Sequence, residues 1–227
     1  MKKYILILAA LLSSACTLFA QNRVSFNAGY GNYLGNSENS APVTNGQKFR
    51  SHFLYGLSLQ KEDLFGLNLM LDYSYNQIKK NNVFTFTQAA YDGTPLAEFG
   101  GDLTLVSHNF DLAYVGSFSR YFSYGAGPSF SIVNRIFELQ TPLKVGEVLI
   151  SPERANLYDK LASSHLGVNG FLMFTMPVFE GTGFFVSSKL KFRYTHSVWF
   201  DAGLRNLDNY SQEFTTGEIS LGAGYSF

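Results

Sequence analysis

The most regular pattern in the sequence is the stretch Glu218-Ile219-Ser220-Leu221-Gly222-Ala223-Gly224-Tyr225-Ser226-Phe227. Apolar or aromatic residues take every second position, and small or polar residues take the positions between them. Successive side chains of a β-strand point to opposite faces, so this period of two predicts a strand with one apolar face. An amphipathic helix would instead space its apolar residues three and four apart.

The same alternation recurs upstream in seven further segments. They lie at residues 24–31, 52–60, 67–76, 109–114, 122–132, 166–174 and 184–194. With the last strand they make eight, and transmembrane barrels of bacterial outer membranes have an even number of antiparallel strands. We therefore predict an all-β fold, an eight-stranded antiparallel barrel.

The connections between these segments alternate in length. Short connections are expected around 61–64, 118–121 and 175–183, and long ones at about 33–50, 78–102, 134–161 and 195–212. Outer-membrane barrels have short periplasmic turns and longer extracellular loops. A soluble meander has no reason to sort its connections in this way.

The polar face of the strands separates a membrane barrel from a soluble, ligand-binding barrel of the lipocalin type. A barrel in water would carry charged residues and Thr on its outward face, but here the polar face is mainly Gly, Ser and Asn. Small residues suit the narrow lumen of an eight-stranded barrel, and aromatic residues gather near the expected strand ends, where interfacial girdles form. We expect a transmembrane β-barrel with short periplasmic turns, long extracellular loops and both termini in the periplasm; the soluble barrel is the alternative.

Composition and charge exclude other classes. The chain has 227 residues, enough for one domain, with 17 Lys and Arg against 17 Asp and Glu. A formal net charge of zero gives no electrostatic basis for binding nucleic acid. A transmembrane helix would need a run of about 18 or more apolar residues, and the sequence contains none.

The first twenty residues predict a secretory signal peptide. Lys2 and Lys3 precede a short apolar segment at 4–12 and small residues at 13–20, the order found in cleaved export signals. We therefore expect a signal peptide at 1–20 and an outer-membrane barrel domain at 21–227. Cys16, the only cysteine, loosely fits a lipoprotein motif, and we expect its removal with the signal peptide; lipidation is the alternative.

Three features carry a family resemblance: the signal peptide ending Phe19-Ala20-Gln21, the eight strands and the terminal Phe227. Through them the chain resembles the small outer-membrane β-barrel family, which includes the OmpA transmembrane domain, OmpX, OmpW and their Bacteroidota relatives. The resemblance covers the whole mature chain. It implies a place in the outer membrane of a Gram-negative cell, contact with outer-membrane lipid and no cofactor. It also implies that the last strand is the signal presented to the barrel-assembly machinery, with the residues Ile219, Leu221, Tyr225 and Phe227.

Six charged residues fall on the predicted lumen face. They are Asp72, Asp111, Lys189, Lys191, Arg193 and Glu218. The three bases alternate on the seventh strand, and the two aspartates lie on the third and fourth strands, opposite the seventh and eighth in a ring of eight. Because unpaired buried charges are unfavourable, we expect a charge network of salt bridges that plugs the lumen. A gated path for small ions or solutes is the alternative.

The positions of the histidines bear on whether the chain is a lipid-modifying enzyme. His52, His108, His165 and His196 each have a serine as immediate neighbour, and neighbours in a strand point to opposite faces. We therefore expect no deacylase-type pairing of Ser and His two residues apart on one strand. His52 and His165 are expected to face inward from opposite sides of the ring, which argues against a shared metal. Two polar residues, His108 and Ser188, are expected on the lipid face, and we predict no enzyme.

Three classes of function therefore stand. We favour a structural or surface-interaction role in which the outer loops meet an unidentified partner; the alternatives are a narrow conduit for small or hydrophobic solutes and a lipid-modifying enzyme. The segment 78–102 carries four aromatic residues, which fit either an exposed interaction surface or, as we prefer, a hairpin packed above the membrane. They are Phe84, Phe86, Tyr91 and Phe99.

Overall fold

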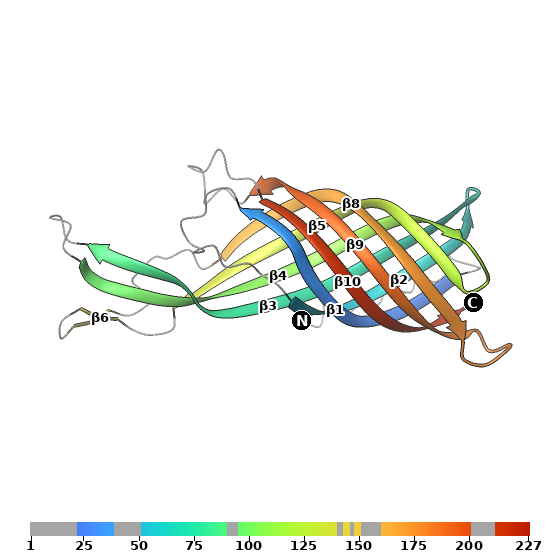
Figure 1. The fold of residues 1–227 in the computed structure, drawn as a ribbon, viewed down its shortest axis with the longest axis horizontal. Helices are drawn as coiled ribbons and strands as arrows, with labels where there is room; N and C mark the ends of the chain where they lie inside the picture. The colour runs from blue at the N-terminus through green and yellow to red at the C-terminus, as the bar shows by residue number, and fades with distance from the viewer. Residues whose placement is uncertain are drawn as a thin grey trace, which may run out of the picture.

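A computed structural model shows a closed barrel of eight antiparallel strands (Figure 1). The structure describes residues 22–38, 51–89, 95–139, 143–145, 148–150, 160–200 and 212–227. None of these residues forms a helix long and apolar enough to cross a membrane. The expected signal peptide at 1–20, with Cys16, lies outside the described residues and stays a prediction.

The barrel strands pair in chain order, and the first closes on the last. They are β1 (Asn22–Glu38), β2 (Ser51–Leu64), β3 (Leu67–Ala89), β4 (Pro95–Ser117), β5 (Phe122–Leu139), β8 (Lys160–Pro177), β9 (Phe184–Phe200) and β10 (Gln212–Ser226). Two short strands, β6 (Leu143–Val145) and β7 (Val148–Ile150), form a separate two-stranded sheet between β5 and β8. The eight predicted barrel strands are confirmed.

Burial alternates along the barrel strands with the period that the sequence predicts. In β9, Phe192 and Tyr194 are 52% and 42% exposed, whereas Lys191 and Arg193 are 3% and 4% exposed. The apolar face therefore points outward and the polar face lines the lumen, because the side chains of one strand point alternately to its two sides.

One end of the barrel carries the short turns and the C-terminus, which lies at the right of Figure 1. There the amide of Phe227 donates to the carbonyl of Asn22 at 2.9 Å, and the amide of Ser226 donates to the carbonyl of Gly183 at 2.8 Å. These bonds join the start of β1, the end of β10 and the turn between β8 and β9.

The turns match the sequence-based expectation in part. The turn at 118–121 lies as expected, and the last turn is shorter than expected, at 178–183. The turn expected at 61–64 is wrong, because these residues continue β2 and the chain reverses at Phe65 and Gly66. Asp63 and Phe65 take left-handed backbone conformations, with φ of 58° and 55°. Phe rarely adopts this conformation, so its residue type did not indicate a turn.

The segment 78–102, expected as a long connection, is mostly strand. β3 and β4 pair as far as Ala89 and Pro95, although β3 pairs with β2 only to Asn76 and β4 pairs with β5 only from Gly101. The outer parts of β3 and β4, residues 77–89 and 95–100, project from the barrel at the left of Figure 1 and are called the β3–β4 arm below. The preferred hairpin is thus confirmed in its backbone pairing; the side chains of the four aromatic residues named above lie outside the described part of the structure.

Candidate functional site

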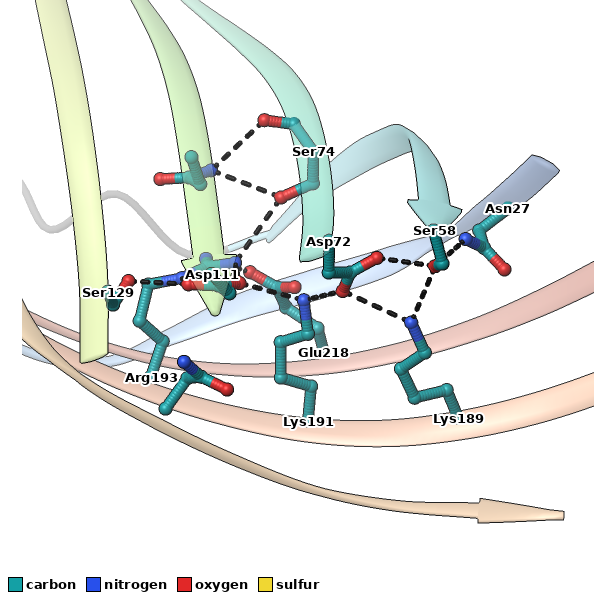
Figure 2. A network of polar contacts seen from close by, with 12 residues as sticks. Asn27, Ser58, Asp72, Ser74, Asp111, Ser129, Lys189, Lys191, Arg193 and Glu218 are labelled. Carbon is teal, nitrogen blue, oxygen red and sulfur yellow. Dashed lines mark hydrogen bonds and ion pairs between the residues drawn. The ribbon is translucent and has the colours of Figure 1, made fainter. Parts of the chain in front are cut away.

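Six charged side chains cross the lumen, and each is at most 6% exposed. The bases come from β9, two acids come from β3 and β4 on the facing wall, and one acid comes from the neighbouring β10. Figure 2 shows the long basic side chains reaching across the lumen to the two aspartate carboxylates. We call this set the ionic layer; it contains Asp72, Asp111, Lys189, Lys191, Arg193 and Glu218.

Each aspartate of the ionic layer contacts two bases. Asp111 Oδ2 lies 2.8 Å from Lys191 Nζ and 2.6 Å from Arg193 Nη2. Asp72 Oδ2 lies 3.1 Å from Lys189 Nζ and also contacts Lys191 Nζ. The other face of the arginine is also paired, because its Nη1 lies 2.5 Å from the Oε1 of Glu218 in β10. Three positive and three negative side chains thus offset one another, as burial of charge requires.

Serines of the lumen wall complete the hydrogen bonding. Ser58 Oγ donates to Asp72 Oδ1 at 2.5 Å and accepts from Lys189 Nζ at 2.9 Å. Ser129 Oγ donates to Asp111 Oδ1 at 2.5 Å. Sequence reasoning treated the lumen serines as small residues that leave space. Their role as partners of the carboxylates was missed, although their position on the same face as the aspartates indicated it.

Little space is left beside the ionic layer. A cavity of about 10 Å³ adjoins Lys191, Glu218, Asn27 and Ser220, and a cavity of this size holds about one water molecule. The described side chains therefore fill the lumen at this level, as expected for eight strands.

Toward the short turns, a cluster of apolar side chains lies in the lumen. This apolar layer contains Met70, Ala113, Val115, Phe171 and Met173, each at most 7% exposed. It meets the ionic layer where Lys189 Nζ lies 5.7 Å from the centroid of the Phe171 ring. The sequence placed Ala113 and Phe171 on the lumen face, but the cluster itself was not anticipated.

At the outer end of the lumen, two aromatic rings connect the two inward histidines. Ring centroids are 5.1 Å apart for His52 and Tyr33, 5.3 Å for Tyr33 and Phe214, and 5.3 Å for Phe214 and His165. Both histidines face inward, as expected, at 3% and 0% exposure. In the part of the chain that the structure describes, no group of three or more His, Cys, Asp or Glu side chains is arranged to hold a metal.

The expectation that no Ser and His lie two residues apart on one strand is wrong. Ser163 and His165 both face the lumen from β8, and Ser163 Oγ lies 2.8 Å from His165 Nε2. Ser164 is the immediate neighbour of His165 and points to the other face of β8, whereas Ser163 lies two residues away on the same face. Both side chains are completely buried, so a lipid outside the barrel does not reach them.

The remaining predicted residues lie on the outward face. The ring of His108 is bonded through Nδ1 to the Tyr73 hydroxyl at 3.0 Å, and Ser188 lines a surface groove. The four residues expected to act as the assembly signal point outward and are 38% to 69% exposed. They are Ile219, Leu221, Tyr225 and Phe227, and their part in assembly stays a prediction.

The outward face as a whole is apolar. Large apolar side chains more than one-third exposed occur on all eight barrel strands, among them Phe26, Phe53, Leu71, Leu112, Phe130, Val168, Leu190 and Leu221. Such a surface is unfavourable in water, whereas a closed barrel with an apolar outside and a polar inside satisfies all its strand hydrogen bonds within lipid. The chain is an outer-membrane β-barrel. In such barrels the short turns face the periplasm, and the β3–β4 arm lies at the end opposite the short turns.

Solved structures with a similar fold include three bacterial proteins. Ail, the attachment invasion locus protein of Yersinia pestis, crystallised with the heparin analogue sucrose octasulfate, is 14% identical with a TM-score of 0.42, over 92% of this chain and 100% of that one. Neisserial surface protein A is 12% identical with a TM-score of 0.43, over 92% and 98%. OprG of Pseudomonas aeruginosa is 14% identical with a TM-score of 0.42, over 92% and 97%.

Similarity of this degree does not indicate a shared activity. The sequence matches no protein-family model, and it matches no curated protein.

Proposed function

We propose that this protein is a closed membrane anchor that presents the β3–β4 arm at the cell surface, where the arm contacts a partner. The observation that carries the proposal is strand length. β3 and β4 each contain 23 residues, whereas a tilted strand crosses the hydrocarbon core with about 9–11 residues. Much of both strands therefore extends beyond the membrane.

The free edge of the arm supports an interaction role. Beyond Asn76, β3 pairs with β4 alone among the described strands. An unpaired strand edge offers a row of backbone donors and acceptors, and partner chains bind such edges by adding a strand. A purely structural barrel would gain nothing from an edge of this kind outside the membrane.

The filled lumen supports an anchor rather than a conduit. The ionic and apolar layers cross the lumen one after the other, and the cavity beside the ionic layer has room for about one water molecule. We expect no steady current from the purified protein in planar bilayers. Steady openings of the wild-type protein that increase in Lys191→Ala would favour the narrow conduit instead.

The interaction is tested by shortening the arm. Lys80 and Leu103 are cross-strand neighbours, so residues 81–102 can be replaced by an Asn-Gly turn without changing the register of the barrel. Surface cross-linking on intact cells should give a conjugate with wild type that the shortened variant loses. Heat-dependent migration on gels shows whether the variant is folded. An identical set of conjugates from a folded shortened variant would contradict the proposal.

A further inference from the structure

A groove lies on the lipid-facing side of β5, β8 and β9, close to the periplasmic end of the barrel. Its volume is about 480 Å³, and its walls are almost entirely apolar, including Phe122, Leu172, Phe174 and Leu190. Ser188 is the reason for the hollow, because its small side chain pairs across the strands with Phe174 and Leu221, which are much larger. The groove is therefore a depression in an apolar wall with one hydroxyl in its lining.

The turn at 118–121 stands at the end of this groove, and Phe118 and Ser119 contribute to the lining. Ser119 Oγ accepts hydrogen bonds from the amides of Tyr121 and Phe122, at 3.3 and 3.2 Å. These bonds fix the turn and leave the Ser119 hydroxyl hydrogen for another acceptor. The turn thus brings a fixed donor to the mouth of the groove.

Arg120 adds a positive charge at the same place. Its guanidinium lies 5.6 Å from the centroid of the Tyr121 ring, and it pairs with no carboxylate in the described part of the chain. The other two periplasmic turns contain acidic residues, which the turn at 118–121 lacks: the chain beside the first carries Lys61, Glu62 and Asp63, and the third carries Glu180. Arg120 is the only charged residue of its turn, so the charge favours an anion here and not at the other turns.

We propose that the groove and this turn bind one anionic phospholipid of the periplasmic leaflet. The lipid phosphate accepts hydrogen bonds from the Arg120 guanidinium and the Ser119 hydroxyl, and one acyl chain lies in the groove over Ser188. Basic residues at the membrane surface attract anionic lipids, and the apolar groove that Ser119 helps to line, next to Arg120 in the chain, selects an anion that carries an acyl chain. The occupant is a phospholipid because the short turns face the periplasm.

The test is native mass spectrometry of the purified mature protein with phosphatidylglycerol or phosphatidylcholine of the same acyl chains. We expect wild type to retain one phosphatidylglycerol in preference to phosphatidylcholine by about fivefold, the effect of one basic residue near a charged surface. Arg120→Gln should bind the two lipids equally, and Arg120→Lys should keep the preference. Ser188→Phe, which fills the groove, should lower the binding of both lipids.

Arg23→Gln is the matched control. Arg23 lies at the same end of the barrel, but its charge already pairs with Glu62 at 3.2 Å, so this variant should behave as wild type. The proposal is overturned if wild type shows no preference, if folded Arg120→Gln keeps it, or if Arg23→Gln loses it to the same extent. Unchanged lipid binding by folded Ser188→Phe would also overturn it, because the groove would then hold no acyl chain.

Discussion

The ionic layer and the apolar layer occupy the same lumen, one above the other, yet different interactions stabilise them. In the ionic layer each charge needs specific partners at hydrogen-bonding distance, such as Asp111 with Lys191 and Arg193. In the apolar layer Phe171 and its neighbours need only contact and the exclusion of water. In the first arrangement the effect of losing a member depends on how many partners it leaves unpaired, whereas the second weakens in proportion to the volume removed.

The largest effect is expected from Asp111→Ala. Lys191 and Arg193 would each lose a carboxylate in a buried position, and removing one partner of a buried ion pair costs about 4 kcal/mol. Urea unfolding in phospholipid vesicles measures the change in the free energy of unfolding. Ser129→Ala, which removes one hydrogen bond to the same carboxylate, should cost only about 1 kcal/mol. Equal losses of unfolding free energy in the two variants would show that the charge of Asp111 stabilises the barrel no more than one hydrogen bond does.

A smaller effect is expected from Phe171→Ala in the apolar layer. Truncation of a buried Phe costs about 3 kcal/mol, at the low end of the usual range, because neighbouring side chains can partly fill the space. Phe171→Leu should recover most of the lost stability, because only the volume of the buried side chain matters in this layer. The same unfolding measurement applies. If Phe171→Leu were as unstable as Phe171→Ala, the apolar layer would depend on specific ring contacts, and the contrast with the ionic layer would fail.

Strand geometry explains why so much of the lumen could be predicted. The alternation of side chains decided which residues face inward, and the strand order of a closed ring placed β3 opposite β9 and β4 opposite β10. These two rules suffice to place the side chains of Asp72 and Lys191 inside the barrel, on opposite walls of the lumen. They do not determine which acid meets which base, because that depends on the stagger of the strands. Arg193 accordingly joins Glu218 of the adjacent strand as well as Asp111 across the lumen.

Other features lay beyond sequence reasoning, for different reasons. The left-handed conformation of Phe65 has no signature in the residue type. The β3–β4 arm was expected as a hairpin, but polar residues within it concealed how far the two strands continue. The groove over Ser188 depends on the size of side chains on adjacent strands, which a reading of single strands does not combine. The pair Ser163 and His165, by contrast, was visible in the sequence, because residues two apart share a face.

An effect smaller than those of Asp111→Ala and Phe171→Ala is expected where the two layers meet, from Lys189→Met. Lys189 Nζ contacts Asp72 and Ser58 on one side and lies over the Phe171 ring on the other. Met is about as long and is apolar, so the substitution extends the apolar layer by one residue while Asp72 keeps its contact with Lys191. We expect a loss of about 1.5 kcal/mol, the low end for a hydrogen bond to a charged group. Lys191→Met is the matched control. It removes the base between both aspartates, and its loss should approach that of Asp111→Ala. Equal losses in Lys189→Met and Lys191→Met would mean that the ionic layer extends down to Phe171, and that no boundary between the two kinds of packing exists at this residue.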